Sequence, residues 1–74
     1  MDDDEKAELI SRLFALLTSR FEDGAQIALE RQGTGHDTDD LRSSANRIWG
    51  ISEEILTIAM ATSALLPQEN APEG

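Results

Sequence analysis

Residues Arg47–Leu66 read RIWGISEEILTIAMATSALL, a stretch with more apolar side chains than one small helical hairpin is able to cover. The stretch contains no proline, and Pro67 follows it directly. Its uncharged part, Ile55–Leu66, is shorter than the roughly 20 apolar residues that a membrane span needs. The pattern therefore predicts a soluble, buried helix that makes contacts on more than one side.

The turn-forming residues of the chain gather in GTGHDTDD, Gly33–Asp40, which separates two segments of similar length. Glycine at the end of the first segment and Asp37 or Thr38 before the second are typical helix stop and start signals. We expect a helix over about 3–32, a loop over 33–38 and a helix over about 39–66, joined as an antiparallel hairpin in one domain over 1–66. The polar residues 67–74 are expected to form a disordered tail.

Both predicted helices carry apolar or small residues in alternating steps of four and three, the spacing of a coiled-coil contact. In the first helix this predicted contact stripe consists of Ile10, Phe14, Leu17, Phe21, Gly24 and Ala28. In the second it consists of Leu41, Ala45, Ile48, Ser52, Ile55, Ala59, Thr62 and Leu66. We expect the two stripes to pack against each other within the hairpin, with Gly24 allowing close approach.

Further side chains lie beside these stripes and form a second predicted interface. They are Leu9, Leu13, Leu16, Arg20, Ile27, Trp49, Ile51, Leu56, Ile58, Met60 and Leu65. At about 25 cal/mol per Å² of apolar area, leaving them in water would cost several kcal/mol. A second copy of the chain would cover them, so the all-α hairpin is expected to dimerise into a four-helix bundle.

Composition restricts the class of protein. The chain has 74 residues, no cysteine, and 15 acidic against six basic side chains, for a net charge of -9. A domain this small gains from a partner, and disulfides and thiolate metal sites are excluded. The negative charge opposes binding to nucleic acid and to anionic membranes. The acidic beginning shows no export signal, so the expected location is the cytoplasm.

No set of residues indicates catalysis or a cofactor. The loop holds His36, Asp37, Asp39 and Asp40, but it lacks the length and glycine position of a calcium-binding loop. The Glu53–Glu54 pair lacks the histidine three residues further on that carboxylate-bridged metal sites in bundles use. We therefore expect no metal, no cofactor and no enzymatic activity.

These observations favour a non-enzymatic interaction module, acting as a small adaptor, assembly factor or regulator through self-association. Two alternatives remain open. The expected architecture resembles in outline the Rop family of plasmid RNA-organising proteins, with no shared motif. That resemblance would imply a nucleic-acid regulator, for which Arg12, Arg20 and Arg31 of this chain are the residues to test. The other alternative is an obligate subunit or inhibitor of another protein, for which the acidic charge favours a basic partner.

Overall fold

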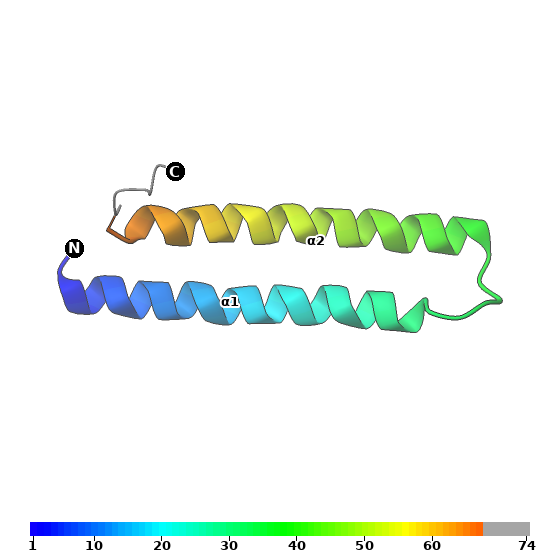
Figure 1. Cartoon of the computed structure of the whole chain (residues 1–74), viewed down its shortest axis with the longest axis horizontal. Helices are drawn as coiled ribbons and strands as arrows, with labels where there is room; N and C mark the ends of the chain where they lie inside the picture. Colours follow the sequence, from blue (N-terminus) through cyan, green and yellow to red (C-terminus); the bar gives the residue numbers. More distant parts are fainter. Residues whose placement is uncertain (68–74) are drawn as a thin grey trace, which may run out of the picture.

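The computed structural model describes residues 1–67 and contains two helices, α1 (Asp3–Glu30) and α2 (Thr38–Leu65). The helices lie side by side in opposite directions, so that the N-terminus and the last turn of α2 meet at one end and the connecting loop lies at the other (Figure 1). The all-α, two-helix hairpin is confirmed. α1 ends two residues before the predicted position, α2 is displaced by one residue at each end, and the predicted tail lies outside the described residues except for Pro67.

Side chains close to each helix start satisfy its first backbone N–H groups. Asp2 accepts a hydrogen bond from the Glu5 amide at 2.8 Å, and Glu5 accepts one in return from the Asp2 amide at 3.4 Å, which makes a capping box. Asp37 accepts from the Asp40 amide at 2.7 Å and caps α2. Gly33 and Gly35 have φ values of 90° and 95°, which glycine adopts most readily, and they turn the chain back.

The two helices meet along what we call the interhelical core, in which every side chain is buried or half-buried. Its members on α1 are Ile10, Leu13, Leu17, Arg20, Gly24, Ile27 and Arg31, and on α2 Ser44, Ile48, Ile51, Ile55, Ile58, Thr62 and Leu65. Burial is shallow. Within residues 1–67, Ile27 is the only apolar side chain that counts as fully buried, with 6% of its surface exposed. A hairpin with so little buried apolar surface has a weak core of its own.

The predicted contact stripes are only half right. Ile10, Leu17 and Gly24 lie between the helices as expected, as do their counterparts Ile48, Ile55 and Thr62 on α2. The alternate members of each stripe are exposed instead: Phe14, Phe21, Ala28, Leu41, Ala45, Ser52, Ala59 and Leu66. Each helix is rotated about its axis, so that apolar neighbours on the other flank of the stripe make the contact within the chain.

The explanation offered for Gly24 is also wrong. A methyl group built at Gly24 would lie 3.8 Å from the Ile51 side chain, which is an ordinary van der Waals distance. Glycine is therefore not required for the two helices to approach at this level. By contrast, the Thr62 hydroxyl donates to the Ile58 carbonyl at 2.8 Å, as expected for a small hydroxyl inside a helix interface.

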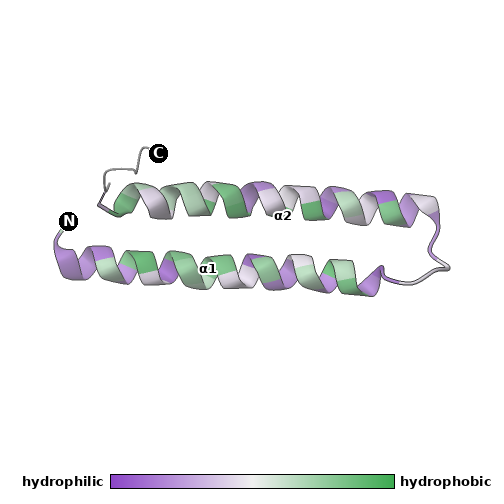
Figure 2. Cartoon of the chain, in the orientation of Figure 1, coloured by the Kyte–Doolittle hydropathy of each residue, from purple (hydrophilic) through white to green (hydrophobic). Residues whose placement is uncertain are grey.

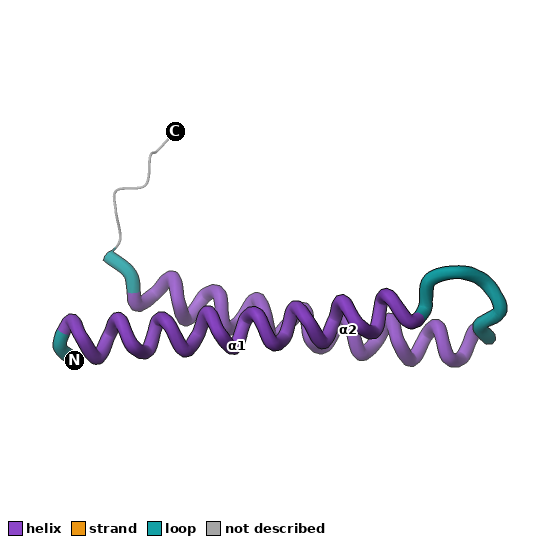
Figure 3. Tube along the Cα trace, turned by 90° about the horizontal axis from the view of Figure 1, so that it is seen from below, coloured by secondary structure: helices purple, strands orange, loops and turns teal. Residues whose placement is uncertain are grey.

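The hairpin is a single layer. Its Cα trace extends over 52 Å in length and 16 Å in its thinnest direction, and the view turned by 90° shows the helices crossing at a shallow angle (Figure 3). No other element within residues 1–67 covers either broad face of this layer. Hydrophobic positions recur along the length of both helices rather than at one end (Figure 2).

Candidate functional site

One broad face of the hairpin is exposed and carries no charge. On both helices it consists of residues that directly follow a residue of the interhelical core, apart from Leu41 at the start of α2. Both helices are right-handed and run in opposite directions. The residue that follows a core residue in the sequence therefore points to the same side of the layer on α1 and on α2. We call this surface the open face: Phe14, Thr18, Phe21, Ala25, Ala28, Leu41, Ala45, Trp49, Ser52, Leu56, Ala59, Ser63 and Leu66.

All thirteen residues of the open face are exposed, and none is charged, although 28% of the chain is Asp, Glu, Lys or Arg. Phe14, Phe21 and Trp49 leave 54%, 59% and 68% of their surface in contact with solvent. At about 150–250 Å² for each aromatic side chain, these three alone expose roughly 350 Å². That is already comparable to the largest apolar patch of a typical soluble monomer.

The α2 half of the open face contains a shallow hollow of about 430 Å³. It is lined by Ala45, Ile48, Trp49, Ser52, Glu53 and Leu56. Its lining combines the large apolar side chains of Ile48, Trp49 and Leu56 with the small side chains of Ala45 and Ser52. Because Glu53 is its one charged residue, the hollow suits a bulky apolar side chain more than a polar ligand.

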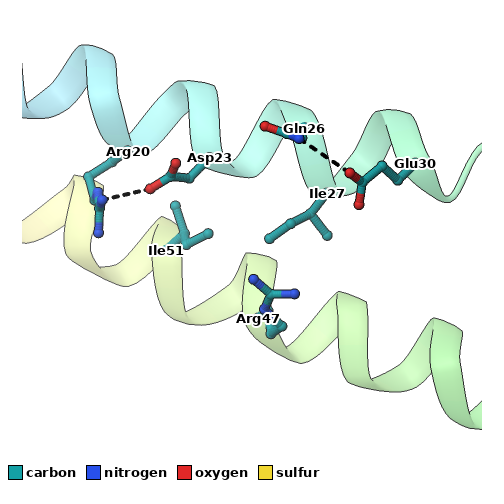
Figure 4. Close-up of a pocket in the computed structure, with 7 residues that line it drawn as sticks. All are labelled: Arg20, Asp23, Gln26, Ile27, Glu30, Arg47 and Ile51. Carbon is teal, nitrogen blue, oxygen red and sulfur yellow. Dashed lines mark hydrogen bonds and ion pairs between the residues drawn. The ribbon is translucent and has the colours of Figure 1, made fainter.

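The opposite face, which we call the polar face, is formed by residues that directly precede the interhelical core. It contains a groove of about 540 Å³ between the two helices (Figure 4). The groove is lined by Arg20, Asp23, Gln26, Ile27, Glu30, Arg47 and Ile51. Two basic and two acidic groups lie around a floor of two isoleucines, so the groove has no net charge.

Arg20 spans the two helices at the edge of this groove. Its guanidinium lies 2.6 Å from Asp23 on the same helix and 3.4 Å from Glu54 on α2. All three side chains keep access to solvent, which screens the ion pairs and limits their contribution. The Arg20 Nε atom is shielded from solvent and has no hydrogen-bond partner. Arg20 therefore packs through its stem and pairs at its tip.

The other two arginines of the nucleic-acid hypothesis are paired with acceptors as well. Arg31 donates to Ser44 at 2.8 Å and lies 3.2 Å from the Asp40 carboxylate, and Arg12 pairs with Glu8 at 3.2 Å. Arg47 makes no ion pair within the described part of the chain. The predicted arginine face is thus a series of separate ion pairs rather than a cationic surface.

The acidic residues at the start of α2 cap the helix or form ion pairs. Asp37 is the N-cap residue of α2. The Asp39 carboxylate lies 3.2 Å from Arg42, and the Asp40 carboxylate lies 3.2 Å from Arg31. His36 is half-buried, with its Nε2 atom 3.4 Å from the Gln32 carbonyl oxygen. Across residues 1–67 no group of three or more His, Cys, Asp or Glu side chains is arranged to hold a metal ion.

The residues of the second predicted interface fall into two groups. Leu13, Arg20, Ile27, Ile51, Ile58 and Leu65 belong to the interhelical core, and Leu9 is half-buried beside it. Leu16, Trp49, Leu56 and Met60 are exposed, between 44% and 68%. Trp49 and Leu56 belong to the open face, Met60 borders it, and Leu16 lies on the polar face. Sequence reasoning therefore missed Phe14 and Phe21 as outward-facing residues, because their spacing fits a contact within the chain equally well.

By length and composition alone, α2 is long and apolar enough to cross a membrane, and 6% of its most apolar 18-residue window is buried. Every 18-residue window within Thr38–Leu65 includes both Glu53 and Glu54. A carboxylate at the centre of a membrane helix costs about 2.5–3.5 kcal/mol on insertion scales. Glu54 is in addition paired with Arg20 of α1. These two carboxylates therefore raise the cost of inserting α2 into a bilayer.

Comparisons of the chain with protein-family models, with curated proteins and with solved structures find no match.

Proposed function

We propose that the protein is a non-enzymatic interaction module that dimerises through its open face, so that two hairpins form a four-helix bundle. The observation that carries this proposal is the uncharged, exposed surface of thirteen residues that spans α2 and the part of α1 from Phe14 to Ala28. Depletion of charge with enrichment of aromatic side chains is the compositional mark of an interface core.

The spacing of the open face supports a second copy as its occupant. In a four-helix bundle, residues in alternating steps of three and four point toward the bundle axis, away from the midline between any two helices. The open-face residues keep that spacing and are exposed in the single hairpin: Phe14, Thr18, Phe21, Ala25 and Ala28 on α1, and Ala45, Trp49, Ser52, Leu56, Ala59, Ser63 and Leu66 on α2. In such a bundle they would face the axis, and they include the alternate members of each predicted stripe apart from Leu41.

The available area is also sufficient for a dimer. Aliphatic side chains on and beside the open face, Leu29, Leu41, Leu56, Met60 and Leu66, are 41% to 65% exposed. Together with the aromatic residues they bring the apolar area to roughly 800 Å² for each chain, which is what one partner contributes to a stable interface of standard size.

The ion pairs of the arginines and the position of the polar face also bear on the proposed function. The arginines of the nucleic-acid alternative are held by carboxylates, so a phosphate would have to displace them. The polar face, which stays outside a bundle built on the open face, is where an adaptor or regulator would meet other molecules. A cytoplasmic location accords with this proposal. An obligate subunit of another protein would expose the same open face, and the following experiment separates the two.

Light scattering during size exclusion, over a range of dilutions, tests the proposal. The 8.1 kDa chain should elute with twice its mass. Phe21→Glu introduces a carboxylate into the open face and should give a monomer. Leu16→Glu introduces the same group on the polar face of the same helix and should leave the dimer intact. A wild-type protein that is monomeric or aggregated, or a Leu16→Glu variant that dissociates as readily as Phe21→Glu, would overturn the proposal.

A further inference from the structure

The two halves of the open face have different shapes. The α1 half carries two large projections, Phe14 and Phe21, one on either side of the exposed Thr18. The α2 half carries small side chains at Ala45, Ser52, Ala59 and Ser63, along with the hollow between Trp49 and Leu56. Because Trp49 and Leu56 on α2 are large and exposed, the α2 half is low only at Ala45 and Ser52, on either side of Trp49, and at Ala59 and Ser63 beyond Leu56. We call these low places the α2 groove.

The register of the hairpin shows which parts of the two halves lie at the same level. Gly24 lies opposite Ile51, and Arg31 opposite Ser44, so residues whose numbers add up to 75 are level with each other. By this register Phe14 is level with the interval between Ala59 and Ser63. Phe21 is level with the interval between Ser52 and Leu56. Phe14 thus shares its level with two small residues of α2, and Phe21 with the small Ser52 beside the large Leu56.

Two symmetric arrangements bury the open faces of two copies against each other. With the two-fold axis across the helices, α1 packs on α1 and α2 on α2. This places Phe14 and Phe21 in one helix pair with their own copies, and Trp49 and Leu56, with the small residues between them, in the other. With the axis along the helices, α1 of each copy packs on α2 of its partner. Neighbouring helices are antiparallel in both arrangements, so helix dipoles do not distinguish them.

Packing does distinguish them. Protein interiors are filled to crystal-like density, which requires that large side chains of one helix enter the spaces beside small side chains of the next. If like helices pair, Phe14 and Phe21 share one helix pair with their own copies, and Trp49 and Leu56 share the other with theirs. When α1 packs on α2, Phe14 meets Ala59 and Ser63 at its own level, and Phe21 lies beside Ser52. Leu56 and Trp49 are then level with the small residues Thr18 and Ala25 of the partner.

We infer that in the dimer α1 of each copy lies in the α2 groove of its partner, with the two-fold axis along the helices and both loops at the same end. This inference rests on the proposed dimerisation through the open face. It identifies Phe14 and Phe21 as the inserting residues, and Ala45, Ser52, Ala59 and Ser63 as the residues that must stay small.

Distances between spin labels test the arrangement. The chain has no cysteine, so one label is introduced in each copy through Thr34→Cys, in the exposed loop. With adjacent helices about 8–10 Å apart, labels on two loops at the same end should be separated by roughly 30 Å or less. If the loops lie at opposite ends, the separation should instead reach or exceed the 52 Å length of the hairpin, which would overturn the inference.

A label at Ala15→Cys, near the middle of α1 and on its outer side, is the matched control. Both arrangements place two such labels within a similar short distance, so dipolar coupling at this position reports dimerisation alone. Coupling at Ala15 with a long distance at Thr34 rejects the arrangement and keeps the dimer. The absence of coupling at Ala15 rejects the proposed dimerisation itself, and the arrangement with it.

Discussion

Arg31, the C-cap residue of α1, and Ser44 on α2 are joined by a hydrogen bond of 2.8 Å from Nε to Oγ, next to the loop that links the two helices. Ser44 is 4% exposed, and the same guanidinium lies 3.2 Å from the carboxylate of Asp40 in the first turn of α2. This contact satisfies a buried hydroxyl and fixes the level at which the helices pair. The contact thus marks the register of the hairpin, that is, which residues of α1 lie opposite which residues of α2.

Arg31→Ala should lower the free energy of unfolding by about 1–2 kcal/mol, because it leaves the buried Ser44 hydroxyl without its donor and removes the pairing with Asp40. Arg12→Ala is the control. Arg12 pairs with Glu8 on an exposed surface, and its loss should cost less than about 0.5 kcal/mol. Urea unfolding followed by circular dichroism, at one fixed protein concentration, gives both values. Equal effects of the two variants would show that the Arg31–Ser44 contact contributes no more than a surface pair.

Arg20→Met should leave stability unchanged within about 1 kcal/mol or increase it, because methionine keeps the packed stem and removes the shielded, unpartnered Nε atom. Arg20→Ala removes the stem as well and should destabilise the hairpin. Thermal unfolding of the two variants beside the wild type measures the difference. If methionine is as damaging as alanine, the ion pairs with Asp23 and Glu54 matter more than the packing.

Gly50→Ala should raise the free energy of unfolding by up to about 1 kcal/mol, because alanine favours a helix and nothing lies within 4 Å of the added methyl group. Gly24→Ala should behave similarly, with an ordinary contact to Ile51. Gly33→Ala is the contrasting substitution. Gly33 has φ of 90°, so the added methyl group should destabilise the loop. Chemical unfolding of the three variants checks the signs, and a loss of stability in Gly50→Ala would point to an unseen contact at that position.

The elements of the fold could be predicted from the sequence, since their signals are local. Asp37 caps α2 as expected, and Gly33 and Gly35 adopt the left-handed conformation that the loop needs. The rotation of each helix could not be predicted. Apolar residues flank Leu17 on both sides, Leu13 on one and Phe14 and Phe21 on the other, so periodicity alone allows either flank to face α2.

The choice between the flanks depends on long-range contacts that leave no periodic signal. Arg20 reaches Glu54 across the hairpin, and Arg31 reaches Ser44 and Asp40. These pairs accompany the rotation that turns Leu13, Arg20 and Ile27 toward α2 and leaves Phe14 and Phe21 on the open face. An arginine between apolar residues was the one local sign of this rotation, and its partner on α2 was not visible from spacing.

Dimerisation should become tighter as salt is added. Each copy carries a net charge of -9, and in the inferred arrangement the acidic first turns of α1, with Asp3 and Asp4, lie at the same end of the bundle. Salt screens this repulsion, since the Debye length falls from about 10 Å at 0.1 M to about 3 Å at 1 M. The dissociation constant, measured by sedimentation equilibrium, should fall several-fold between 50 mM and 500 mM sodium chloride. Asp3→Asn combined with Asp4→Asn should tighten the dimer at low salt and flatten its salt dependence. A general salting-out of apolar surface would leave that dependence the same in the variant and in the wild type.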